Sequence, residues 1–310
     1  MGVLQSTLEA IGHTPVVQLR KVVPADAARV LVKLEYFNPT GSYKDRMARA
    51  MIEGAEARGE LKPGMTVVEY TGGSTGSSLA FVCALKGYPL KIVTSDAFAP
   101  EKLRTIAAFG AELIIEPSSG GQITPDLIPR MIARAREIVA EEGAYPTDQF
   151  NNADMLNGYA GIATELLEQV DGPIDAFCGG VGTAGMILGV ARSLRAAGGG
   201  TRIVGFEPAS APLLSEGRKG SHHIEGVGVG LVPPLLKEGD LDEVRAIDEG
   251  EARMMARRLA REEGIFTGVS SGMSATGAIA LARELGPGKT VVTVAVDTGL
   301  KYLAGDLFSG

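Results

Sequence analysis

One glycine-rich segment has the residue types and spacing of a phosphate-binding turn. Residues 179–185 read Gly-Gly-Val-Gly-Thr-Ala-Gly, between an apolar run typical of a strand and a segment typical of a helix. Free backbone N–H groups and the helix dipole favour an anion at such a turn. Gly180, Gly182 and Gly185 also fit the dinucleotide-binding fingerprint, and Glu207 ends the next predicted strand as a candidate ribose ligand. Two interpretations stay open here, a cradle for another phosphate and an NAD-binding oxidoreductase.

A second glycine-rich segment favours a small anion. Thr71-Gly-Gly-Ser-Thr-Gly76 follows a predicted strand and begins a predicted helix. Its small hydroxyls and bare amides suit a carboxylate. It lacks the Gly-Lys-Ser/Thr ending of a P-loop, which argues against nucleotide hydrolysis. A third turn, at residues 268–272, precedes a helix of small residues. Each turn taken alone is equally explained as a tight connection between strand and helix.

Lys44 is placed where an amine could be activated. It lies in Asn38-Pro-Thr-Gly-Ser-Tyr-Lys-Asp-Arg46, at the predicted first turn of a helix. The positive end of a helix dipole and desolvation both lower the pKa of an ammonium, as a Schiff-base lysine requires. A surface lysine that merely precedes a helix would show the same pattern.

The elements that must position these residues predict an α/β protein. Seven apolar runs are continuous rather than alternating, as buried parallel strands are. They cover residues 29–33, 66–69, 91–94, 112–115, 174–178, 202–206 and 290–296. Helical periodicity lies between them, with Met47, Met51 and Ala55 on one stripe and a second helix over about 125–142. Their alternation predicts two mostly parallel sheets flanked by helices.

Composition and charge exclude several classes of protein. The 310 residues include 37 acidic and 30 basic ones, and the net charge of −7 argues against nucleic-acid binding. No apolar stretch approaches the ~18 residues of a membrane span, and the N-terminus lacks the apolar segment of a signal peptide. Cys83 and Cys178 lie in apolar runs, which predicts buried free thiols. We expect a cytoplasmic globular protein with no metal, nucleic-acid or membrane partner.

Several ordered motifs together carry a family resemblance. Besides Asn38–Arg46, they are Ile11-Gly-His-Thr-Pro-Val-Val-Gln-Leu19, Lys33-Leu-Glu35, Gln149-Phe-Asn151, Gly226-Val-Gly-Val-Gly230 and Asp297-Thr-Gly-Leu-Lys-Tyr-Leu303. Over nearly the whole chain they resemble the cysteine synthase family, also called O-acetylserine sulfhydrylases, whose fold cystathionine β-synthase shares. In that family the segment around Lys44 binds pyridoxal 5′-phosphate (PLP). The NAD interpretation, by contrast, assigns no role to Lys44.

The resemblance implies PLP fold type II, like that of the tryptophan synthase β chain. Two domains are expected, each with a twisted, mostly parallel sheet flanked by helices. A smaller mobile domain over residues 37–148 would bind the substrate carboxylate. A larger domain over residues 149–310, completed by 1–36, would hold the PLP phosphate and pyridine ring. A homodimer is also expected.

The resemblance also implies a set of site residues. Lys44 would hold PLP as a Schiff base and remove the substrate Cα proton. The implied cofactor-binding residues are Lys44, Ser74, Gly182, Thr183, Ala184, Gly185, Met186 and Ser270. Thr183 is the clearest phosphate ligand among them, and Ser270 would hydrogen-bond the pyridine nitrogen. The implied substrate-binding residues are Thr71, Gly72, Gly73, Thr75 and, from the other domain, Gln149.

Four of these residues depart from the family pattern. Relatives usually read Gly-Thr-Gly-Gly-Thr at 182–186, where this chain has Ala184 and Met186. They usually read Thr-Ser-Gly-Asn-Thr-Gly at 71–76, where this chain has Gly72 and Ser74. The family's Asn reaches the cofactor's 3′-oxygen, and a serine hydroxyl is shorter and lacks the amide.

The implied reaction is β-replacement on an O-activated L-serine through an α-aminoacrylate intermediate. Cysteine synthesis from O-acetylserine or O-phosphoserine and sulfide fits best, with cystathionine β-synthase-like or diaminopropionate synthase-like replacement as alternatives. The choice of donor bears on a basic cluster at residues 218–223, Arg-Lys-Gly-Ser-His-His, because a phosphate dianion would gain from positive charge near the site. The same cluster is also explained as a solvated loop with scattered charges.

Overall fold

The computed structural model describes residues 2–122, 124 and 126–309, which form two compact units. The first unit consists of the residues up to Ile11 and of Lys44–Gly158. The second consists of Gly12–Tyr43 and the residues from Tyr159 onward. Helix α5, Asp154–Gln169, begins in the first unit and ends in the second. Each unit has its own sheet, so the predicted α/β class with two parallel-sheet regions is confirmed.

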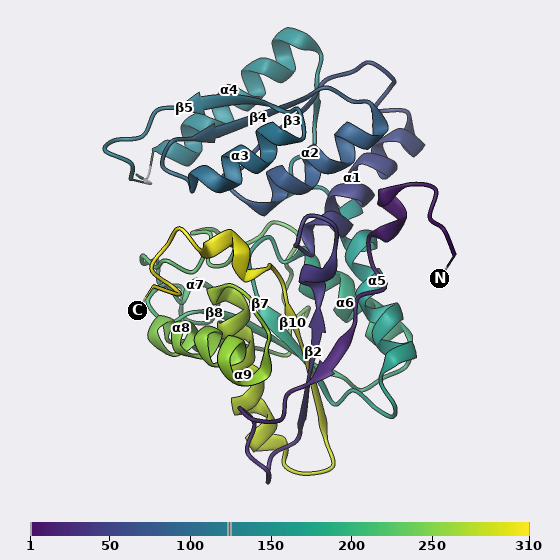
Figure 1. Ribbon diagram of the computed structural model, residues 1–310, viewed down its shortest axis with the longest axis vertical. Coiled ribbons are helices and arrows are strands. Elements are labelled where there is room, and N and C mark those ends of the chain that lie inside the picture. Colours follow the sequence, from purple (N-terminus) through teal and green to yellow (C-terminus); the bar gives the residue numbers. More distant parts are fainter. Residues whose placement is uncertain (1, 123, 125, 310) are drawn as a thin grey trace. The chain divides into compact units, whose positions relative to one another are not determined.

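The first unit contains a four-stranded parallel sheet in the order β5-β4-β3-β6. Its strands are β3 Val67–Tyr70, β4 Leu90–Ser95, β5 Glu112–Glu116 and β6 Tyr145–Pro146. Its helices are α1 Lys44–Arg58, α2 Ser74–Lys86, α3 Pro100–Ala108 and α4 Leu127–Glu142, with a 3-10 turn at Thr7–Ala10. Figure 1 shows α2 and α3 on one face of this sheet and α4 on the other. Val68, Val93 and Met131 belong to the core between α4 and the sheet.

The second unit contains a six-stranded sheet in the order β1-β2-β10-β7-β8-β9. Its strands are β1 Val16–Gln18, β2 Arg29–Leu34, β7 Ala176–Gly180, β8 Arg202–Pro208, β9 Glu243–Ile247 and β10 Thr290–Ala295. The pairing of β1 with β2 is antiparallel, and the other pairings are parallel. Its helices are α6 Gly185–Ala196, α7 Leu213–Glu216, α8 Glu249–Arg258 and α9 Val269–Leu285, with a π-helical turn at Leu259–Glu263 and 3-10 turns at Glu35–Phe37 and Gly299–Tyr302. Helices α8 and α9 pack together, and α9 covers the central strands (Figure 1).

The seven predicted strands all form, within two residues of their expected ends. The stripe of Met47, Met51 and Ala55 is buried on α1, as predicted. Helix α4 confirms the second predicted helix, although its expected first residue, Pro125, lies outside the described residues. The strands that the pattern missed are β1, β6 and β9, each at the edge of its sheet. Edge strands are short or carry charged residues, so they lack the apolar run that marks a central strand.

The boundaries of the compact units differ from those expected at 36/37 and 148/149. The chain enters the first unit after Tyr43, whose N–H donates to the Val296 oxygen at 3.0 Å and so holds this segment in the second unit. It leaves the first unit only after Gly158. Thr147 N donates to the Val68 oxygen at 3.1 Å, which holds the stretch after β6 against β3. Backbone hydrogen bonds between distant segments therefore set the boundaries of the two units. The local amino-acid composition does not reveal these hydrogen bonds.

Both cysteines are free and buried, as predicted. Burial raises the pKa of the Cys83 and Cys178 thiols to about 12, so neither forms a reactive thiolate near neutral pH. Across the described ranges, no helix is both long enough and apolar enough to cross a bilayer.

Candidate active site

Lys44 is the first residue of α1, as the sequence predicts, and it is buried, with 8% of its surface exposed. The residues before it are attached to the second unit, because Ser42 forms an isolated β-bridge with Asp297. Asp297 is held in turn, since Thr267 Oγ1 donates to its backbone oxygen at 2.7 Å and the Tyr302 hydroxyl donates to Oδ2 at 3.2 Å. The lysine therefore follows an anchored segment and begins a helix.

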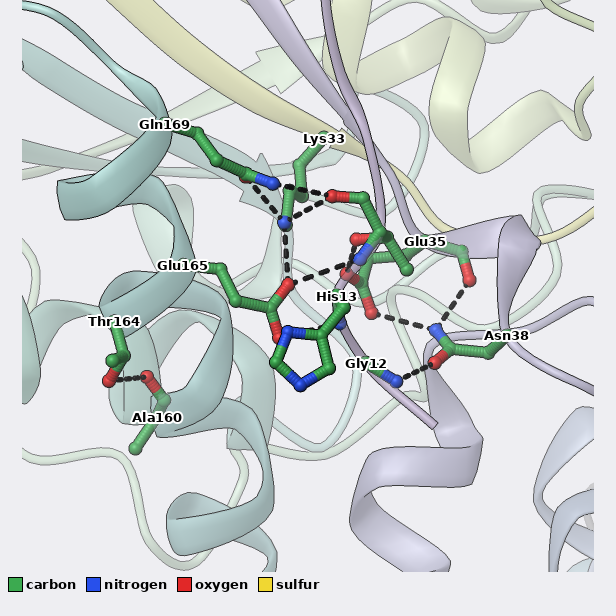
Figure 2. A network of polar contacts seen from close by, with 10 residues as sticks. Gly12, His13, Lys33, Glu35, Asn38, Ala160, Thr164, Glu165 and Gln169 are labelled. Atoms are coloured by element: carbon green, nitrogen blue, oxygen red, sulfur yellow. Dashed lines mark hydrogen bonds and ion pairs between the residues drawn. The ribbon is translucent and has the colours of Figure 1, made fainter. Parts of the chain in front are cut away.

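A buried polar network in the second unit supports the strand that leads toward Lys44 (Figure 2). Lys33 is fully buried, and its Nζ lies 2.6 Å from a carboxylate oxygen of Glu165 on α5. The same ammonium donates to the Thr14 oxygen at 2.6 Å and to Oε1 of Gln169 at 2.7 Å. Because an unpaired charge is strongly disfavoured inside a protein, these partners are what allow a lysine here. The Lys33 ammonium thus forms a structural ion pair with Glu165.

The other half of this network centres on Glu35 and Asn38 (Figure 2). Thr14 Oγ1 donates to Glu35 Oε1 at 2.6 Å, and Asn38 Nδ2 donates to Oε2 at 2.9 Å. Asn38 Oδ1 accepts from the Gly12 N–H at 2.8 Å. Hydrogen bonds therefore join the opening segment to Glu35 and to Asn38, the first residue of the lysine motif. Sequence reasoning found these residues only as motif matches and missed that they form one network.

The predicted phosphate turn connects β7 to α6 in the second unit. A Cβ added at Gly182 would lie 2.1 Å from the Gly226 oxygen, so close backbone packing requires glycine there. The first bond within α6 runs from Leu188 N to the Ala184 oxygen at 3.0 Å. The N–H groups that precede it in the first turn have no acceptor four residues earlier in the helix. This cradle, with the buried hydroxyl residue Thr183 in it, fits a phosphate group.

The two departures in this cradle have local explanations. Ala184 has φ 63° and ψ −5°, the left-handed conformation that favours the glycine usual in the family. A residue with a Cβ is strained in this conformation. The Met186 methyl carbon lies 2.9 Å from the position of a Cβ on Gly179, so it fills the space beside that glycine. The backbone cradle is kept although one hydroxyl is lost.

Ser270 lies in the first turn of α9 and is buried, with 7% of its surface exposed. Ser274, one turn later, donates from Oγ to the Ser270 oxygen at 2.9 Å and accepts at Oγ from the Gly180 N–H at 3.2 Å. The start of α9 is therefore joined to the phosphate turn by a single side chain. The structure brings these two predicted elements of the second unit together.

Glu207 has a different role from the ribose ligand considered for an NAD site. It is buried, and its two carboxylate oxygens accept from Leu214 N at 2.7 Å and Ser215 N at 2.8 Å. Ser215 Oγ adds a third hydrogen bond at 2.6 Å. A carboxylate that accepts N–H groups at the start of α7 is a structural cap. The NAD interpretation of the fingerprint at 180–185 therefore lacks its candidate ribose ligand.

The candidate substrate loop, Thr71–Thr75, connects β3 to α2 in the first unit. Thr75 Oγ1 donates to Oε1 of Gln149 at 2.8 Å, and Gln149 Nε2 donates to the Tyr70 oxygen at 3.4 Å. Gln149 was expected from the other domain, but it belongs to the same compact unit as the loop. The structure therefore brings the predicted Thr75 and Gln149 together within one unit.

Glu69, immediately before this loop, is a residue that the sequence reasoning missed. Its side chain is buried, and it accepts from Thr147 Oγ1 at 2.7 Å, Gln149 N at 3.1 Å and Tyr70 N at 2.9 Å. Burial raises the pKa of Glu69 to about 7, although these hydrogen bonds act in the opposite direction. Its only signal in the sequence was a carboxylate at the end of a strand otherwise built from apolar residues.

No group of three or more metal-ligating side chains occurs among the described residues. The chemistry of each of the two turns, taken within its own unit, is that of anion binding by backbone and hydroxyl groups, and the first unit also contains the buried Lys44 at the start of α1. These features fit a phosphorylated aldehyde cofactor held through its phosphate and through a lysine amine.

Comparisons with known proteins agree along the chain. A family model described as pyridoxal-phosphate dependent enzyme matches residues 7–297. A cysteine synthase from Staphylococcus aureus is 44% identical over 303 residues, covering 97% of this chain and 96% of that protein. The crystal structure of a cysteine synthase from Entamoeba histolytica has a TM-score of 0.94 at 34% identity, covering 100% of this chain and 92% of that one. A structure of an O-ureido-L-serine synthase has a TM-score of 0.91 at 36% identity, covering 100% and 96%.

Proposed function

This chain belongs to the family of pyridoxal-phosphate dependent enzymes, and from that premise we propose that it catalyses β-replacement on an O-activated L-serine. In the reaction that fits best, O-acetyl-L-serine and sulfide give L-cysteine and acetate. The observation that carries the proposal is the 44% identity to a cysteine synthase over 97% of the chain. The buried Lys44 at the start of α1 supports it.

In this proposal Lys44 binds the cofactor through its amine and removes the proton from the substrate Cα. Bound PLP supplies an electron sink for the negative charge that develops at that carbon. The cradle at 182–186 holds the phosphate through backbone N–H groups and Thr183. Ser270 donates to or accepts from the pyridine nitrogen, and a neutral partner there leaves the ring a weaker electron sink than a carboxylate would. That balance favours loss of a β-substituent over transamination.

The substrate carboxylate binds the loop Thr71–Thr75 in this proposal. The Thr71 hydroxyl and the backbone N–H groups at the start of α2 supply the donors. The Thr75 hydroxyl itself donates to Gln149 Oε1 at 2.8 Å, and this hydrogen bond fixes the Thr75 side chain. A carboxylate is recognised well by several neutral donors at the start of a helix. Ser74, the first residue of α2, stands where the family's Asn reaches the cofactor.

The basic cluster at 218–223 supports the acetyl ester over the phosphate ester as donor. Arg218 lies 2.6 Å from Glu216 and His223 lies 3.3 Å from Glu249, so both side chains have carboxylate partners. His222 Nε2 lies 2.9 Å from the Gly228 oxygen and holds the glycine loop. We expect a higher kcat/KM with O-acetylserine than with O-phosphoserine, and we expect Arg218→Ala to leave that preference unchanged. A preference for O-phosphoserine would contradict this choice.

The nucleophile is the less constrained part of the proposal. Homocysteine, giving cystathionine, and an amine, giving diaminopropionate, remain alternatives to sulfide. Mass spectrometry of the products formed from O-acetylserine with each nucleophile in competition separates them. Sulfide should dominate if the full-length similarity to cysteine synthases extends to the substrate.

Covalent labelling tests the assignment of Lys44. Borohydride reduction of the holoenzyme followed by peptide mapping should place a pyridoxyl group on Lys44. A label on Lys33 would contradict the assignment, because that ammonium is paired with Glu165. Lys44→Ala should abolish turnover yet retain PLP through the cradle. Lys62→Ala, an exposed lysine in the same unit, is the matched control and should keep full activity.

The proposal includes two properties expected from the resemblance, a homodimer and a cytoplasmic location. Light scattering coupled to gel filtration should give twice the 32.2 kDa mass of one chain. Fractionation of cells that express the protein should recover it with the cytoplasmic fraction. A monomer that is fully active would remove the dimer from the proposal.

A further inference from the structure

Gly72, in the candidate substrate loop, is covered by an aromatic ring. A Cβ added at this glycine would lie 2.2 Å from Cδ1 and Cγ of Phe98 and 2.4 Å from Cδ2. Such distances mean that the ring packs directly against the Gly72 main chain, where no side chain can fit. The family pattern has a serine at this position. In this chain a glycine replaces the serine, and the Phe98 ring occupies the space that a side chain would need.

The ring cannot move aside easily, because the loop that carries it is held at several points. Phe98 N donates to the Ser95 oxygen at 3.2 Å, and Ala97 N donates to Ser95 Oγ at 3.3 Å. Asp96 Oδ1 accepts from Ser118 N at 2.8 Å. The ring itself is half-buried and packs against the core of β3, β4 and α4. The atoms nearest to Gly72 are also at the base of the ring, so only a new rotamer or a shift of the backbone would make room.

The neighbouring glycine shows that this contact is specific. A Cβ added at Gly73 would meet no heavy atom within 4 Å. The two glycines are adjacent in the same loop, yet one position is filled by Phe98 and the other is open. Gly73→Ala is therefore a matched control for Gly72→Ala, with the same atom added one residue away.

We propose that Phe98 is a positioning residue for the amino-acid substrate, and that its ring holds the Gly72 main chain in the carboxylate-binding conformation. A glycine loses more conformational freedom than any other residue when it is ordered. Packing against a fixed ring confines Gly72 before the substrate arrives, which lowers the entropy lost on binding. The ring thus offsets the serine hydroxyl that this loop lacks. This inference rests on the proposed function, since it assigns the loop to the substrate carboxylate.

A double-mutant cycle tests the contact and its role. The holoenzymes of wild type, Phe98→Ala, Gly72→Ala and the double variant are compared by KM for O-acetylserine, by kcat, and by urea unfolding. We expect Phe98→Ala to raise KM about tenfold with kcat nearly unchanged, because the loop loses order but no reacting group. We expect Phe98→Leu to recover part of that loss. Gly72→Ala should raise KM in the wild-type background and much less when Phe98 is alanine, because the ring is then gone.

Two controls show whether the effect belongs to this pair. Gly73→Ala should change KM by the same factor with either residue at position 98. Phe109→Ala removes another ring of this unit, which packs edge-on against Phe81 at 5.8 Å, and it should leave KM unchanged. Additive effects of Gly72→Ala and Phe98→Ala on KM would overturn the proposal. Coupling in urea unfolding alone, with the KM of Phe98→Ala unchanged, would also overturn it. Failure of the proposed function would appear in the wild-type protein, whereas failure of this inference would appear only in these variants.

Discussion

The cradle at 182–186 and the substrate loop at 71–75 are both glycine-rich turns between a strand and a helix, but contacts of different kinds limit the residues that fit in them. In the cradle the backbone itself leaves no room, since a Cβ on Gly182 would meet the Gly226 oxygen at 2.1 Å. In the loop the limits come from side chains, with the Phe98 ring over Gly72 and open space beside Gly73. A glycine packed against backbone tolerates little increase in side-chain size. A glycine packed against a side chain can be replaced if that side chain changes as well.

This difference explains how each turn departs from the family pattern. In the cradle, Ala184 adopts the left-handed conformation that favours glycine and Met186 packs against Gly179, so the backbone N–H groups proposed to bind phosphate are unaffected by either change. In the loop, Gly72 and Ser74 lack the polar groups of the Ser and Asn that are usual in the family and that the proposal assigns to substrate and cofactor. We therefore expect binding of the cofactor's phosphate to follow the family norm, and we expect this chain to differ in the contacts of the loop with the substrate and with the cofactor's 3′-oxygen.

The largest effect is expected from Gly182→Ala. The added Cβ would meet a backbone oxygen that cannot rotate away, so the turn or the 226–230 loop must shift. We expect the affinity for PLP to fall by more than about a hundredfold, because the proposed phosphate contacts depend on this backbone geometry. Equilibrium dialysis of the cofactor measures it. Gly200→Ala, at an exposed glycine with nothing within 4 Å of an added Cβ, should bind PLP normally.

The next effect concerns the carboxyl group of Glu69, a residue of β3 shortly before the substrate loop. Because burial raises the pKa of Glu69 from 4.5 to about 7, the folded state binds more protons than the unfolded state between these values. The contribution of this group to stability is therefore present below about pH 4.5 and is lost as pH rises through 7. The slope reaches at most about 1.4 kcal/mol per pH unit. Urea unfolding of wild type from pH 5 to 8 should show this decline.

Glu69→Gln should flatten that pH dependence, because the amide does not titrate. It should also raise KM, since Gln cannot accept the hydrogen bonds of Thr147, Tyr70 and Gln149 with equal strength. Glu141→Gln, an exposed substitution on α4, is the control and should keep the wild-type slope. An unchanged slope in Glu69→Gln would show that another group titrates in this range.

A smaller effect is expected from Ser74→Asn in the loop. The longer amide side chain restores the group with which relatives reach the cofactor's 3′-oxygen. One added hydrogen bond contributes about 0.5–1.5 kcal/mol, or roughly two- to tenfold in affinity. We expect tighter PLP binding and a shift in the cofactor absorbance. An identical spectrum and affinity would mean that the serine already makes an equivalent contact.

The smallest effect is expected from Ala184→Gly in the cradle. Glycine adopts φ 63° without the steric cost that alanine has there. Removing that strain should stabilise the folded protein by about 1 kcal/mol or less, because the greater freedom of glycine in the unfolded chain opposes it. Thermal unfolding should show a small rise in Tm with PLP affinity unchanged. A fall in Tm would mean that the alanine methyl group makes a stabilising contact.

Much of this protein could be predicted from its sequence because the relevant signals are local. Continuous apolar runs marked the central strands, since a strand buried on both faces needs an apolar residue at every position. The glycine-rich turns and the lysine at a helix start were also local, and they predicted anion binding and an activated amine. The order of the motifs along the chain then indicated PLP, which the family comparison supports.

Other features were decided only by the tertiary structure. The sequence could not show that Glu207 caps α7, that Glu69 holds Gln149, or that Phe98 covers Gly72, because each pair is joined by the way strands and loops meet in space. Their separations along the chain follow no repeating pattern, and each contact depends on side-chain direction as much as on residue type. The boundaries of the two units were hidden for the same reason, since the hydrogen bond from Tyr43 to Val296 joins residues far apart in the chain. Local sequence determines which elements form and what chemistry they carry, whereas long-range packing determines which groups remain available for it.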